Sequence, residues 1–101
     1  MNKKLKTKTL DFEGCKSALD FYDRIIDALE LGVGYCGRNW SAIYDFACTE
    51  STVEKLIIKN TDKLTDELKS ALPMLYKVLD KVTQERKRYG VFIYEVVNKS
   101  I

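Results

Sequence analysis

Three short apolar segments, separated by stretches of helical periodicity, constrain the fold of this chain more than any other feature. Residues 7–13, 53–59 and 91–97 have the composition of strands, and the last is almost continuously apolar, which is typical of a strand covered on both faces. Strands that alternate with helices connect through right-handed crossovers and pair in parallel. The sequence therefore predicts an α/β fold, a three-stranded parallel sheet packed with about four helices.

The helices are marked by capping residues and by apolar stripes. Ser17 can cap the first, with Asp20 three residues further on, and glycines at 32 and 34 end it near residue 30. The second follows Asn39 to about residue 49, a short one follows Thr61, and the last runs from near residue 70 to 86–88. The first helix is expected to bury Ala18, Leu19, Tyr22, Ile25, Ile26 and Leu29. The last is expected to bury Leu75, Val78, Leu79 and Val82.

Composition argues against catalysis and metal binding. The 101 residues include no histidine, which is the commonest general base and metal ligand. The three cysteines are widely spaced and form no CxxC pair, so buried, reduced thiols are expected. No segment resembles a secretory signal or a membrane span. We therefore expect a cytoplasmic protein without enzymatic activity, cofactor or metal.

Charge is distributed unevenly along the chain, although the net charge is only +2. Residues 1–8 carry four lysines and no acid, residues 9–54 carry nine acids and three bases, and residues 55–101 carry ten bases and six acids. An acidic surface favours a basic partner, because complementary potentials steer encounter. Scattered surface charge explains the same asymmetry equally well.

Residues 35–45, with the sequence YCGRNWSAIYD, combine a tight loop with the start of a helix. Asn39 is a favoured N-cap residue, since its side-chain oxygen accepts a hydrogen bond from an otherwise unpaired backbone N–H. Helical spacing predicts a buried stripe of Trp40, Ile43 and Ala47. The side chains expected to point away from the core are Ser41, Asp45 and Cys48, with Tyr44 at the edge. A short carboxylate on a rigid helix suits insertion into a cationic pocket.

The order of elements and the motif Tyr35-x-Gly37-x-Asn39-x-x-Ala42-x-Tyr44-Asp45 resemble the barstar family of ribonuclease inhibitors. The resemblance implies a single barstar-like domain over residues 7–101, preceded by a basic extension at residues 1–6. It also implies that segment 35–49 plugs the active site of a small ribonuclease, with Asp45 in the place of substrate phosphate. The partner contacts that it implies are Tyr35, Gly37, Arg38, Asn39, Ser41, Tyr44, Asp45, Cys48 and Thr49.

Several positions depart from the family pattern. Ser41 is neutral where the family often has an acid, and Arg38 is basic where the prototype has an acid. A supporting acid on the last helix has two candidates, Asp80 and Glu85. These departures predict a cognate enzyme that differs from the best-known ribonuclease of the family.

The resulting prediction is a stoichiometric immunity protein against a bacterial ribonuclease toxin, of the kind used in toxin–antitoxin systems or contact-dependent growth inhibition. We expect a monomer that forms a 1:1 complex and has neither nucleic acid nor membrane as partner. One alternative is immunity against another nuclease or basic toxin. A second is a nucleic-acid-binding regulator that uses the basic clusters, Lys3, Lys4, Lys6 and Lys8 with Arg86, Lys87 and Arg88. The acidic row Asp20, Asp23 and Asp27 is expected to be a solvated helix face rather than a metal site.

Overall fold

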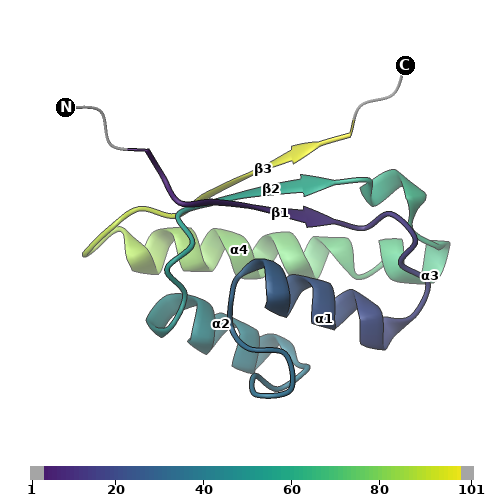
Figure 1. The fold of residues 1–101 in the computed structure, drawn as a ribbon, viewed down its shortest axis with the longest axis horizontal. Helices are drawn as coiled ribbons and strands as arrows, with labels where there is room; N and C mark the ends of the chain where they lie inside the picture. Colours follow the sequence, from purple (N-terminus) through teal and green to yellow (C-terminus); the bar gives the residue numbers. More distant parts are fainter. Residues whose placement is uncertain (1–3, 99–101) are drawn as a thin grey trace.

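The computed structural model describes residues 4–98, so residues 1–3 of the predicted extension and residues 99–101 lie outside the described part of the chain. Strands, helices and one 3-10 turn (η1) follow one another as Figure 1 shows. In order they are β1 (Thr7–Asp11), α1 (Ala18–Ala28), α2 (Trp40–Thr49), β2 (Lys55–Lys59), η1 (Thr61–Lys63), α3 (Asp66–Lys69), α4 (Leu72–Arg86) and β3 (Ile93–Val97).

The three strands form one parallel sheet in the order β1-β2-β3. Leu10 pairs with Ile58, which pairs with Val96, so the strands are in register across the sheet. The predicted α/β class with a three-stranded parallel sheet is confirmed. Of the helices in residues 4–98, α1, α2 and α4 are longer than two turns, whereas α3 is a single turn.

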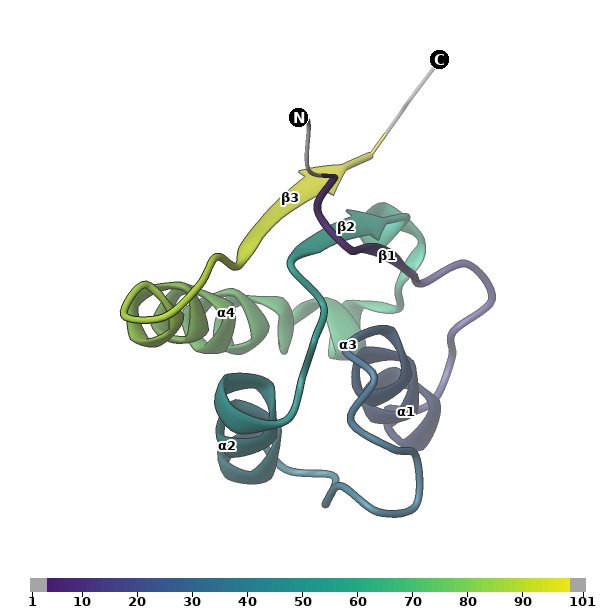
Figure 2. The ribbon, with the colours of Figure 1, turned by 60° about the vertical axis from the view of Figure 1, so that its left-hand side comes forward.

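All helices lie on one side of the sheet, as Figure 2 shows. This follows from the strand order, because two successive right-handed crossovers that advance in the same direction leave their helices on the same face. The expectation that the last strand is covered on both faces was therefore wrong. β3 is an edge strand, and Ile93 and Val96 are each 41% exposed.

The predicted buried stripe of α1 is confirmed at Ile25, Ile26 and Leu29, but it is wrong at the start of the helix. Ser17 caps the helix as expected, accepting a hydrogen bond of 3.1 Å from the Asp20 backbone N–H. Leu19 is 57% exposed, whereas Phe21 is buried and stacks on Phe12 beneath the sheet, with ring centroids 5.1 Å apart. Ala18 is also exposed. In the first turns of the helix the prediction therefore chose Ala18 and Leu19, whereas Phe21 is the residue that faces inward.

Helix α4 has the predicted apolar stripe. Leu75, Val78, Leu79 and Val82 are all buried, and Pro73 lies in the first turn, where its missing N–H costs nothing. Arg86 lies at the other end of α4, where the run of cations 86–88 was expected to end the helix. Its side chain is buried, donates a hydrogen bond of 2.9 Å to the carbonyl of Val53, and lies over the Phe92 ring.

Helix α2 packs chiefly on α4 rather than on the sheet. Figures 1 and 2 place it below α4, on the side away from the strands, with the loop from α1 at the bottom of the molecule. Ile43 and Ala47 are fully buried in this contact, as predicted. The packing therefore leaves the outer side of α2 and the preceding loop facing away from the rest of the domain.

Candidate binding surface

The loop that leads to α2 begins with a left-handed residue at the end of α1. This residue is Glu30 (φ 60°) and not the glycine that the sequence suggested. The N–H of Leu31 bonds to the carbonyl of Ile26 at 2.9 Å, which closes the helix end. The glycines at 32 and 34 then adopt positive φ in the following turn. This sharp reversal turns the chain away from the core towards the tip of the loop.

The start of α2 is fixed by Asn39. Its side-chain oxygen accepts a hydrogen bond of 2.8 Å from the Ala42 N–H, which confirms the predicted N-cap. Gly37 packs closely against this cap, because a Cβ at that position would come within 2.9 Å of Asn39 Nδ2. The glycine is therefore needed for close approach within the loop itself.

Arg38, the basic departure from the family pattern, has a partner within the chain. Its Nε and Nη2 lie 2.7 and 3.2 Å from the two oxygens of Asp23 on α1. This hydrogen-bonded pair raises the pKa of the Arg38 guanidinium. The bidentate contact holds the loop against α1 and compensates the positive charge locally.

The outward row of α2 consists of Ser41, Asp45 and Thr49, which follow one another at intervals of four residues and are all exposed. The Thr49 hydroxyl donates a hydrogen bond of 2.8 Å to the backbone carbonyl of Asp45. Within residues 4–98, no ion pair engages the Asp45 carboxylate. By contrast, Asp23 and Glu30 are paired with cations of the chain. Asp45 thus presents an uncompensated negative charge at the centre of this surface.

Aromatic side chains flank this row. Tyr35 is 77% exposed and leans on Phe46, with ring centroids 5.4 Å apart. Tyr44 is half-buried, and its hydrogen bond with Cys48 is the main cause that raises the pKa of the phenol. Cys48 was expected to point away from the core, and this was wrong, because it is buried. Its spacing after Ile43 and Ala47 is also that of an inward residue.

The thiols of Cys36 and Cys48 are both buried, and burial raises the pKa of each. Both therefore remain protonated at neutral pH. This fits the expectation of unreactive thiols, and the three cysteines of the chain are free. Oxidation of Cys36 would require the loop to open first.

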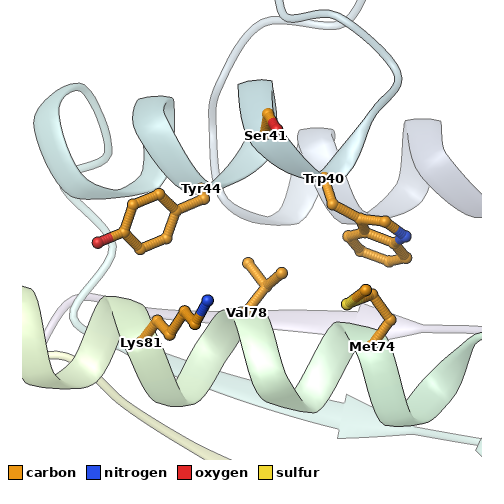
Figure 3. Close-up of a pocket in the computed structure, with 6 residues that line it drawn as sticks. All are labelled: Trp40, Ser41, Tyr44, Met74, Val78 and Lys81. Carbon is orange, nitrogen blue, oxygen red and sulfur yellow. The ribbon is translucent and has the colours of Figure 1, made fainter.

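An open groove of 460 Å³ lies beside this surface, between α2 and α4. Trp40, Ser41 and Tyr44 form its α2 side, and Met74, Val78 and Lys81 form its α4 side, as Figure 3 shows. Sequence reasoning missed the groove. The α4 residues share one helical face, but only the packing of α2 shows that this face is left partly open.

The two candidate supporting acids on α4 are separated by the structure. Asp80 accepts a hydrogen bond of 2.7 Å from the hydroxyl of Tyr94 on β3, on the sheet side of the helix. Glu85 lies near Tyr44 and Cys48 and contributes to raising the pKa of both. Of the two, Glu85 is therefore the acid on the side of α2.

The acidic row on α1 is partly neutralised. Asp20 pairs with Arg24 at 3.0 Å and Asp23 pairs with Arg38. Among residues 4–98, no three side chains of the histidine, cysteine or carboxylate type are grouped as metal ligands would be. In the same part of the chain, no helix has the length and apolarity required to cross a bilayer.

Comparison with known families identifies this architecture. The profile of the family described as Barstar (barnase inhibitor) matches residues 5–97, nearly the whole chain. Comparisons with curated proteins and with solved structures gave no match. The family match agrees with the parallel sheet and with the loop and helix that expose Asp45. The chain therefore belongs to the Barstar family of barnase inhibitors.

Proposed function

We propose that the protein is an immunity protein that inhibits a ribonuclease toxin by filling its substrate site with segment 35–49. Family membership supports the general role of a ribonuclease inhibitor. The observation that carries the finer proposal is the exposed Asp45 carboxylate, which has no cation of its own chain in residues 4–98. A ribonuclease site that binds phosphate supplies the missing cations. Asp45 then acts as the phosphate mimic.

The rest of the segment prepares Asp45 for this role. The Asn39 cap and the Arg38–Asp23 pair hold the loop and helix in place before binding, which reduces the entropy lost on association. Tyr35 and Tyr44 flank the carboxylate with amphipathic rings, which suit interfaces. The contact surface also includes Gly37, Ser41 and Thr49. Cys48 is buried and contributes indirectly, through its hydrogen bond with Tyr44.

Glu85 is the second acid in this proposal. It stands on the α2 side of α4 and its only ion pair in the described residues is a long one, 3.9 Å to Arg88. A second carboxylate at the edge of the surface extends the acidic field towards a basic enzyme. Glu85 thus supplies a second negative charge, which the family often has at the position of the neutral Ser41.

The cytoplasm is the proposed site of action, with one inhibitor bound to one toxin. The three free thiols and the absence of disulfides among them fit a reducing compartment. An enzyme-like mechanism is not part of the proposal, because inhibition by an inserted carboxylate is stoichiometric.

Immunity against a different nuclease or basic toxin is a second candidate. The mixed charge of this face favours it, since Ser41 is neutral and Lys81 adds a positive charge in the groove that Ser41 and Tyr44 also line. The regulator hypothesis is weakened by Arg86, which is buried and so does not belong to an exposed basic cluster.

The test uses the C-terminal domain encoded by the reading frame next to this one, expressed alone and with the inhibitor, while growth and RNA integrity are followed. Wild type should prevent RNA degradation. Asp45→Ala should weaken binding by about 3 kcal/mol, or roughly a hundredfold in Kd, because cations of the enzyme remain buried without a partner.

The matched control is Asp62→Ala. It removes the same charge from the η1 turn, which lies at the opposite end of the molecule from α2 in Figure 1. It should protect RNA as well as wild type does. If Asp45→Ala protects RNA as well as wild type does, Asp45 is not the phosphate mimic. If the inhibitor relieves growth inhibition and the toxin causes no RNA damage, the second candidate, immunity against a different nuclease or basic toxin, is favoured.

A further inference from the structure

We propose that the groove between α2 and α4 is a second recognition site, which receives one apolar side chain of the toxin that lies next to a carboxylate. The proposal rests on the proposed function, since it takes the occupant to come from the same ribonuclease. According to this proposal, the toxin has a basic surface on which one acidic group must lie opposite the groove.

The walls of the groove are mostly apolar, and Trp40 is held in place by neighbouring rings. The Trp40 ring contacts Tyr22 and Phe21 edge-on, with centroids 5.2 and 6.4 Å away. These contacts hold the indole from the core side and leave its other side to the groove. Val78, 6% exposed, lies between the two ends of the groove (Figure 3). The site is therefore largely formed before anything binds.

Met74 provides the adaptable part of the wall. Its side chain is 43% exposed, although burial of this apolar side chain would be favourable. In Figure 3 its side chain points towards Trp40, across the groove. An unbranched thioether adjusts to the shape of an incoming side chain and contacts aromatic rings favourably. An aromatic or large aliphatic group fits these walls.

Lys81 gives the groove its charge. It lines the same space, opposite Tyr44 (Figure 3), and forms no ion pair within residues 4–98. Among residues 4–98 no acidic side chain lines the groove, and Glu85, which lies near Tyr44, is outside the lining. An incoming apolar side chain beside a carboxylate satisfies both the walls and the ammonium group, whereas a cation is repelled.

The groove is continuous with the proposed inhibitory surface. Ser41 and Tyr44 belong to both, and Asp45 follows Tyr44 directly on α2. A partner on this face thus meets a negative charge at Asp45 and a positive charge at Lys81. Such an alternating pattern selects one partner and penalises enzymes with a uniformly basic surface.

The chemistry of the groove can be measured without the toxin, because Trp40 is the only tryptophan of the chain. Trp40 fluorescence is recorded during titration with phenylacetate, phenylacetamide and phenethylamine, which share a ring and differ in charge. We expect phenylacetate to bind best and phenethylamine worst. Lys81→Glu should reverse this order. The same response to all three compounds, or none, would overturn the proposal.

The occupant is then tested with the toxin domain by calorimetry. Lys81→Glu should raise Kd by about tenfold or more, which corresponds to about 1.4 kcal/mol. The matched control is Lys77→Glu, an exposed lysine one turn earlier on α4 that does not line the groove, and it should change Kd much less. Equal effects of the two variants would show that only general charge matters and would overturn the proposal.

A compensating change identifies the contact. Each surface carboxylate of the toxin domain is replaced in turn by lysine, and one replacement should restore binding to Lys81→Glu while weakening binding to wild type. If no replacement has this effect, the proposal that a carboxylate of the toxin contacts Lys81 is overturned. If wild type forms no complex with the toxin domain, the proposed function fails with it, whereas the phenylacetate titration still decides the chemistry of the groove.

Discussion

Replacing Arg86 by alanine is expected to destabilise the fold by about 3 kcal/mol. The side chain is 8% exposed, and its guanidinium donates to the buried carbonyl of Val53 and lies 5.3 Å from the centre of the Phe92 ring. Leaving the carbonyl without a partner costs about 1–3 kcal/mol. Loss of the cation–π contact costs about 0.5–2 kcal/mol more. Arg86 thus joins the end of α4 to the segments that lead into β2 and β3.

Urea unfolding followed by circular dichroism measures this loss. With an m value of about 1.5 kcal/mol/M, the midpoint should fall by about 2 M. The matched control is Lys87→Ala, an exposed neighbour, which should stay within about 0.5 kcal/mol of wild type. A loss below about 1 kcal/mol for Arg86→Ala, or similar losses for both variants, would refute the assignment of a structural role to this buried cation.

Further predictions concern the cap, a tyrosine and the loop. Asn39→Ala and Gly37→Ala should each cost about 1 kcal/mol in urea unfolding, and less than the sum when combined, because both disturb one cap; full additivity would contradict this. Burial and the hydrogen bond donated to Asp80 raise the pKa of Tyr94 to about 12. Stability should therefore fall between about pH 10 and 12, as the unfolded state loses the proton first, and the fall should be smaller but still present in Tyr94→Phe, because the raised pKa values of Tyr44 and Tyr76 also contribute to it. Arg38→Ala should weaken toxin binding about fivefold in calorimetry by freeing the loop, with little change in the urea midpoint; an equal loss of stability would argue against a positioning role.

The sequence predicted the sheet and the cap well because both depend on local signals. Parallel pairing follows from strands that alternate with helices, and the cap at Asn39 follows from one favoured side chain. The covering of β3 failed for a topological reason. Apolar content alone does not show whether helices cover one face of a sheet or both, and the strand order, which places both crossovers on one face, decides it.

Prediction of the binding surface was limited by tertiary packing. Cys48 could be placed on either side of α2, since its spacing fits both the buried stripe and the outward edge, and the structure shows it buried. Arg86 lies four residues after Val82, on the face of the buried stripe, but its place in a run of cations led it to be assigned to an exposed helix end. The groove around Lys81 depends on how α2 lies on α4, which no single helix pattern contains.

The position of α2 has a consequence for how this lineage can diversify. The helix contacts the domain mainly through α4 and is joined to it at its end by a hydrogen bond of 3.1 Å from the Tyr89 hydroxyl to the Cys48 carbonyl. Substitutions on its outer side leave the sheet and its covering helices untouched. The proposed recognition surface can therefore change to fit a different ribonuclease, while selection for folding acts on a different set of positions.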